Sequence, residues 1–95
     1  MIKYSIHARD KLKLLSEFSI DESIVEKSLI EPNEVYYDSL LSSPIAVKKL
    51  NEDAGVIIAF VKEDKDIKVL TIYYTTKLNK VVNAKIRGGR WIKVG

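Results

Sequence analysis

The chain has 95 residues, with 16 basic and 13 acidic side chains, and 46% of its residues are hydrophobic. This length fits a single domain spanning 1–95, and the composition is that of a globular chain. Zero cysteines exclude disulfides and thiol catalysis, and one histidine excludes a multi-histidine metal site. Without a nucleotide-binding or metalloprotease motif either, we expect no cofactor. Since no apolar run approaches the ~20 residues of a membrane span, we expect a cytoplasmic protein.

Two short helices are predicted near the start. Ser5 is placed to cap a helix over residues 6–15. Its inward side would be Ala8, Leu12 and Leu15. After a turn, Ser19 opens the capping box SIDE before a second helix over 20–30, which Pro32 terminates. Neither helix is long enough to be stable alone, so the two are expected to pack as a hairpin on another element.

Strand signals occupy most of the remaining chain. A short strand is predicted at 35–37, followed by longer strands at 44–50, 56–62 and 67–74. Polar loops separate the three longer strands, which predicts an antiparallel meander. In the last strand, simple alternation places Leu70, Ile72 and Tyr74 on one face and Val69, Thr71 and Tyr73 on the other. We therefore expect an α+β fold, with the helical hairpin packed on one face of a mainly antiparallel four-stranded sheet.

The C-terminal segment 77–95 is purely basic, with six Lys or Arg residues and no Asp or Glu. One or two helical turns are predicted before Gly88 and Gly89, and then a short edge strand over 90–94. Acidic residues gather instead in 17–38, where seven acids accompany one lysine. This polarity predicts a basic face for an anionic partner, although segregation that serves only solubility is the alternative.

Three residues are candidates for catalysis. His7 lies in the first turn of the first predicted helix, where the helix dipole disfavours the charged imidazolium. It is interpreted either as a proton carrier or as a structural anchor that hydrogen-bonds locally. Tyr73 either presents its ring and hydroxyl to a ligand or buries the ring and leaves the hydroxyl in water. Lys77 follows the strand and supplies a positive charge.

The candidate nucleic-acid contacts are cations and one aromatic ring. They are Arg9, Lys11, Lys80, Lys85, Arg87, Arg90 and Trp91. An arginine beside a tryptophan after two glycines is a combination suited to stacking on unpaired bases. For Trp91 the alternative is that its ring closes the hydrophobic core, since it is the only tryptophan.

These residues resemble a small family of the RelE/ParE-like toxin superfamily, close to BrnT-type toxins. The likeness spans roughly residues 4–80 and rests on HARDKL near the start, LIEPNEV at the exit of the second helix and TIYYTTK in the last strand. His7 and Ala8 match the opening of the family pattern. Lys11 stands where arginine is usual, and the sequence SEFS at 16–19 replaces an Arg-Gly pair.

The resemblance implies a RelE-like fold and a metal-independent endoribonuclease. Basic and aromatic residues of the sheet and the C-terminal segment would face RNA, with ribosome-bound mRNA as one candidate substrate. Cations would stabilise the developing charge while His7 or a tyrosine moves the proton. An antitoxin is the implied protein partner. The departure at Lys11 leaves open a degenerate relative, and the alternative is a non-catalytic RNA- or protein-binding module with the same fold.

Overall fold

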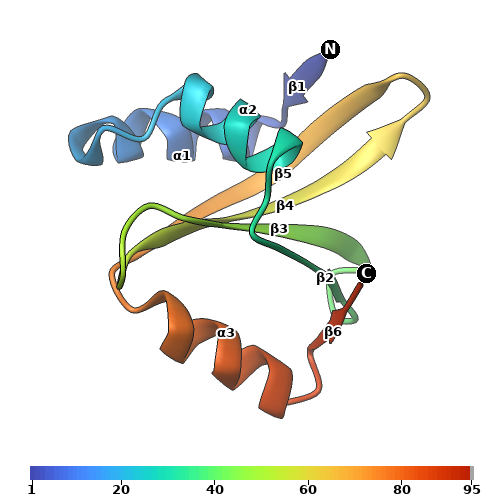
Figure 1. The fold of residues 1–95 in the computed structure, drawn as a ribbon. Coiled ribbons are helices and arrows are strands. Elements are labelled where there is room, and N and C mark those ends of the chain that lie inside the picture. Colours follow the sequence, from blue (N-terminus) through green and yellow to red (C-terminus); the bar gives the residue numbers. More distant parts are fainter. Residues whose placement is uncertain (95) are drawn as a thin grey trace.

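The computed structural model describes residues 1–94 and shows an α+β fold (Figure 1). Gly95, the last residue of the predicted basic segment, lies outside the described residues. The elements in chain order are β1 (Ile2–Tyr4), α1 (Ile6–Leu15), the 3₁₀ turn η1 (Ser16–Phe18), α2 (Glu22–Ile30), β2 (Glu34–Asp38), β3 (Ser43–Lys49), β4 (Gly55–Glu63), β5 (Asp66–Thr75), α3 (Leu78–Arg87) and β6 (Trp91–Lys93). Within the described part, no helix has the length and apolar character to cross a membrane.

The sheet has six strands in residues 1–94, in the order β1-β5-β4-β3-β2-β6. The predicted meander β3-β4-β5 is antiparallel, and β6 pairs antiparallel with β2 at one edge. At the other edge β1 runs parallel to β5, with Ile2 opposite Ile67. The prediction of four strands is therefore wrong. Three residues at the N-terminus are too few to show an alternating pattern, and the partner of β1 lies far along the chain.

Helices cover both faces of the sheet (Figure 1). As expected, α1 and α2 pack together on one face. Their core includes Ala8, Leu15, Ile20, Val25, Val56, Ile58, Val69 and Ile72. The opposite face is covered by α3, which is a full ten-residue helix rather than the predicted one or two turns. Its core includes Tyr36, Ile45, Val47, Ile57, Ala59, Leu78, Val82 and Trp91. The sheet is thus the middle layer of three.

A β-bulge in β5 changes which side chains face each layer. Pairing with β4 steps from Thr71 to Val69, so Leu70 is an extra residue in this strand. Val69 and Ile72 consequently both pack under the α1–α2 hairpin, whereas Leu70 packs toward α3. The simple alternation predicted for this strand is wrong, because the extra residue reverses which face of the sheet the preceding side chains of β5 point to.

Ser5 joins the start of α1 to this bulge. Its hydroxyl oxygen accepts a hydrogen bond from the backbone N of Ala8 at 3.0 Å, which is the predicted N-cap. The same hydroxyl donates to the carbonyl oxygen of Leu70 at 2.9 Å, and the backbone N of Ser5 donates to the carbonyl oxygen of Val69 at 2.9 Å. One residue therefore sets both where α1 begins and how it lies against β5.

The predicted cap of α2 is wrong by two residues. Ser19 adopts a left-handed conformation with φ 61°, and the cap is Asp21, whose Oδ1 accepts from the backbone N of Ile24 at 3.1 Å. Between them, Ile20 is buried in the core under the hairpin. Burying that side chain requires the chain to turn sharply before the helix starts, so Ser19 is used for the turn rather than for the cap.

We expect Ser5→Ala to lower the free energy of unfolding by about 1–2 kcal/mol, because it removes a helix cap and leaves the Leu70 carbonyl without its side-chain donor. Urea unfolding followed by circular dichroism measures this change. Ser23→Ala, at an exposed position of α2, is the matched control and should stay within about 0.5 kcal/mol of wild type. Equal effects of the two substitutions would contradict the role given to Ser5.

Candidate functional site

A cleft of about 310 Å³ lies between α3 and the sheet. Its floor is apolar and consists of Ile45, Ile57 and Ala59 from the central strands. Polar and basic side chains line it as well, namely Thr71, Tyr73, Lys85 and Arg90. An apolar hollow with a few polar groups and cations at its margin is the form expected of a ligand-binding site.

Asp38 also lines the cleft and is 2% exposed. Its Oδ2 accepts from Nε of Arg90 at 3.0 Å and from Nε1 of Trp91 at 3.0 Å. Its Oδ1 accepts from the backbone N of Leu40 and of Leu41, each at 2.9 Å. A buried carboxylate needs such partners, so Asp38 organises the site and has no free oxygen for chemistry.

Two opposing effects act on the pKa of Asp38. Burial is the largest and raises it, whereas the hydrogen bonds from Leu41, Trp91 and Leu40 and the charge of Arg90 lower it. Together the lowering effects prevail, so the pKa lies below its ordinary value. Sequence analysis missed Asp38, because an acid at the end of a strand gives no local sign of a partner near residue 90.

The structure corrects the interpretation of Trp91 as a stacking platform for bases. Its ring is 5% exposed and stacks on Tyr36, with the ring centroids 5.4 Å apart. With its N–H satisfied by Asp38, the indole is a core residue that forms part of the cleft wall. The alternative interpretation, in which the ring of Trp91 closes the hydrophobic core, is confirmed.

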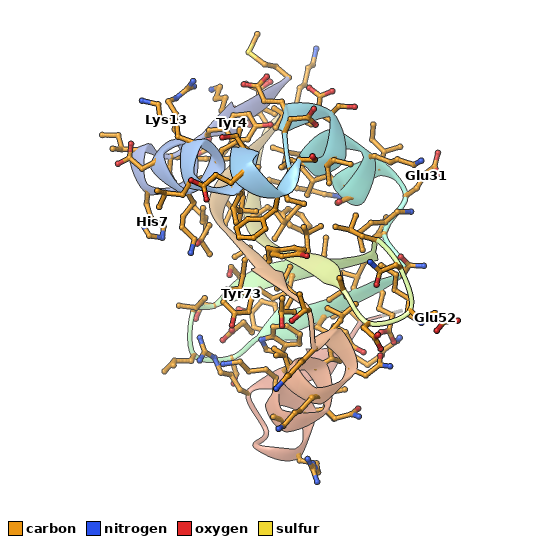
Figure 2. All side chains as sticks on the ribbon, turned by 90° about the vertical axis from the view of Figure 1, so that its left-hand side faces the viewer. Tyr4, His7, Lys13, Glu31, Glu52 and Tyr73 are labelled. Carbon is orange, nitrogen blue, oxygen red and sulfur yellow. The ribbon has the colours of Figure 1, made fainter. Side chains whose placement is uncertain are left out.

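The side of α1 that carries His7 and Lys11 lies next to the cleft. Nζ of Lys11 is 5.9 Å from the ring centroid of Tyr73, which is 47% exposed and lines the cleft. His7 precedes Lys11 by one helical turn and is exposed, and in Figure 2 it projects from α1 on the side toward Tyr73. Its side chain has no hydrogen-bond partner in residues 1–94, so it makes none of the contacts expected of a structural anchor.

The remaining predicted residues lie elsewhere. Lys77 and Lys80 line a separate depression at the start of α3, and Arg87 is exposed near the end of that helix. Arg9 projects from α1 over the ring of Tyr4, with its Cζ 5.8 Å from the centroid. Lys77 is therefore not brought into the cleft that Tyr73 lines, and the three predicted catalytic residues do not share one cavity.

Two of the six cations of the C-terminal segment are paired with acids from β2. Arg90 contacts Asp38, and Nζ of Lys93 lies 2.9 Å from Oε2 of Glu34. The hydrogen bond from Lys93 is the main reason that the pKa of Glu34 lies below its ordinary value. The segment has no acid of its own, but the fold supplies two. Its free positive charge is consequently smaller than its sequence indicates.

Residues 1–94 contain no group of three or more histidine, aspartate or glutamate side chains placed to hold a metal ion. Comparisons with protein-family models, with curated proteins and with solved structures find no match to this chain. Functional inference therefore rests on the side chains that the fold brings together and on the resemblance of the sequence.

We expect Asp38→Asn to lower the free energy of unfolding at neutral pH by about 1–3 kcal/mol, because it removes the charge that Arg90 and the indole N–H bind. The folded-state pKa of Asp38 is depressed, so its stabilisation is full above the unfolded value of about 3.9 and is lost as the pH falls through the folded value. The variant should therefore lose less stability than wild type upon acidification, measured by urea unfolding across that pH window.

Asp64→Asn is the matched control. Asp64 is exposed in the β4–β5 turn with φ 55°, a conformation that asparagine also tolerates. This variant should unfold within about 0.5 kcal/mol of wild type and show the wild-type acid dependence. If Asp38→Asn keeps the full acid dependence of wild type, Asp38 is not the carboxylate that couples pH to stability.

Proposed function

We propose that this chain is a metal-independent endoribonuclease of the RelE/BrnT-like toxin type, with RNA bound across the cleft and the adjoining side of α1. The observation that carries the proposal is the approach of Lys11 to Tyr73, at 5.9 Å from its ring. This contact makes the His7 side of α1 and the cleft one continuous surface. The resemblance of the sequence to that family is the second support.

RNA binding would use the two chemical properties of the cleft. An unpaired base has a flat apolar face that suits the floor formed by Ile45, Ile57 and Ala59. The phosphates on either side would meet Lys85 and Lys11, and also the terminal Nη groups of Arg90, which make no hydrogen bond within residues 1–94. Because Asp38 holds Nε of Arg90, that guanidinium is positioned in advance.

The chemistry would be attack by the 2′-hydroxyl on its own phosphate. His7 takes the proton from the 2′-hydroxyl, the new 2′-O–P bond forms, and the bond from phosphorus to the 5′-oxygen breaks. Tyr73 donates a proton to the leaving 5′-oxygen, so the products are a 2′,3′-cyclic phosphate and a 5′-hydroxyl. Lys11 stabilises the charge that develops on the phosphoryl oxygens. An antitoxin would inhibit by covering this surface.

A second candidate is a non-catalytic module that binds RNA through the same surface. The observation that favours it is that, within residues 1–94, no hydrogen bond fixes the side chain of either residue proposed to transfer a proton. His7 and Tyr73 are exposed, and neither side chain is held by a hydrogen bond in the described residues. Catalytic groups act most effectively when they are positioned before the substrate arrives. The two candidates share the predicted binding surface, so binding assays do not distinguish them. Cleavage assays do.

For RNA binding we expect the double variant Lys11→Gln/Lys85→Gln to weaken binding of a single-stranded oligonucleotide. The slope of log affinity against log salt should become shallower by about 0.7 for each phosphate that the variant no longer neutralises. Fluorescence anisotropy at several salt concentrations measures both quantities. Lys62→Gln/Lys65→Gln has the same charge change at exposed positions near the β4–β5 turn and is the control. Equal slopes in the two double variants would place the binding surface elsewhere.

For catalysis we expect His7→Gln to leave the melting temperature unchanged, because the side chain is exposed and unbonded. Cleavage of RNA should fall by roughly 10²–10⁴-fold, the usual contribution of a general base, and chelators should not reduce the wild-type rate. Gel analysis of RNA incubated with each protein measures the rate. Asp10→Asn on α1 is the control. If wild type binds RNA but does not cleave it, the binding-module candidate replaces the nuclease.

A further inference from the structure

A second cavity lies on the other side of the sheet, between α1 and the start of α2, and has a volume of about 440 Å³. Its apolar lining comes from Leu12, Ile20 and the ring of Tyr4. Figure 2 shows Tyr4 and Lys13 at the end of the molecule formed by the helical hairpin, away from α3. The cavity shares no lining residue with the cleft of the proposed nuclease site.

The hydroxyl of Tyr4 is the first unusual feature of this cavity. Its oxygen is buried and has no hydrogen-bond partner within residues 1–94. Burial, followed by the nearby charges of Glu22 and Glu26, raises the pKa of Tyr4 to about 12. The opposing charge of Arg9 lowers the pKa but does not offset these effects, so the group is a neutral hydroxyl at ordinary pH. A buried polar group without a partner is costly and rare in native proteins, which indicates a partner other than this chain.

The second feature is a set of opposite charges that do not neutralise one another. Arg9 and Lys13 line the cavity from α1, and Asp21 and Glu22 line it from the start of α2. None of these four side chains forms an ion pair in the part of the chain that the structure describes. Asp21 is occupied as the cap of α2, so Glu22 is the acid with both carboxylate oxygens free.

From these features we propose that the cavity binds a free α-amino acid with an apolar side chain. The ammonium group of the ligand lies against Glu22 and donates to the Tyr4 hydroxyl oxygen. Its carboxylate lies against Arg9 and Lys13, and its side chain packs on Leu12 and Ile20. Such a ligand satisfies the hydroxyl, both signs of charge and the apolar wall at once.

Other ligand classes satisfy only part of this set. An amine with an apolar tail would leave Arg9 and Lys13 without an anion, and a carboxylate with the same tail would leave Glu22 without a cation. A nucleotide, whose phosphates would lie against Arg9 and Lys13, brings no cation for Glu22. The proposal does not depend on ribonuclease activity, since the cavity shares no lining residue with the cleft and uses neither His7 nor Lys11.

Titration of the full chain with L-leucine, followed by amide chemical shifts in solution, tests the proposal. Saturable shifts should appear at residues of α1 and at the start of α2. Two analogues of the same shape are the chemical controls, 4-methylpentanoate without the ammonium and isopentylamine without the carboxylate. Each should bind about 2- to 5-fold more weakly than leucine, because each leaves one sign of the exposed charges around the cavity without a partner.

Variants test the assigned residues. Glu22→Gln should weaken leucine binding about 2- to 5-fold, the range for an exposed ion pair, and Tyr4→Phe about 3- to 10-fold, the range for a neutral hydrogen bond. Glu17→Gln and Tyr37→Phe change the same groups at exposed positions outside the cavity and should bind as wild type does. Without ligand, Tyr4→Phe should melt at the wild-type temperature or higher, because it removes an unpaired hydroxyl.

Several results would overturn the proposal. If leucine causes no saturable shifts at millimolar concentration, water is the partner of the Tyr4 hydroxyl and the cavity is not an amino-acid site. If the two analogues bind as well as leucine, the cavity recognises only an apolar tail. If Glu22→Gln and Glu17→Gln weaken binding equally, the effect is one of overall charge. None of these results bears on RNA cleavage, so the nuclease proposal fails or stands separately.

Discussion

The buried carboxylate of Asp38 is the contact on which the α3 side of the molecule depends. It holds the guanidinium of Arg90, just before β6, and the indole of Trp91, the first residue of β6, against the end of β2. Without that charge a three-residue strand would have little to keep it in the sheet. The same carboxylate thereby fixes two side chains that line the cleft, Arg90 and Trp91.

The three-layer arrangement explains how chemistry from distant segments reaches one surface. The hairpin and α3 lie on opposite faces, yet their exposed sides approach each other at β5, where β1 covers only residues 67–69. Beyond that point Lys11 of α1 lies over Tyr73, whose ring also lines the cleft. A bulge in the same strand, held by Ser5, sets this relation between helix and strand. The nuclease proposal uses this junction.

Charge is arranged differently in space from how it is arranged along the chain. The acidic region 17–38 and the basic region 77–95 are separate in sequence, but β2 carries Glu34 to Lys93 of β6 and Asp38 to Arg90, which precedes β6. In contrast, the unlike charges of α1 and α2 face each other across the hairpin cavity without pairing. The pairing of Asp38 offsets the cost of burying its charge, whereas the charges around the hairpin cavity are exposed and open to a ligand.

The sequence alone determined the α+β class, the bounds of α1, the antiparallel meander and the edge position of the last strand, since caps and local periodicity act over a few residues. Only the tertiary structure decided the parallel pairing of β1, the bulge at Leu70 and the burial of Trp91. It also decided that Lys77 lies apart from Tyr73. These features depend on contacts between residues far apart in the chain, and no local pattern encodes which strand end meets which helix.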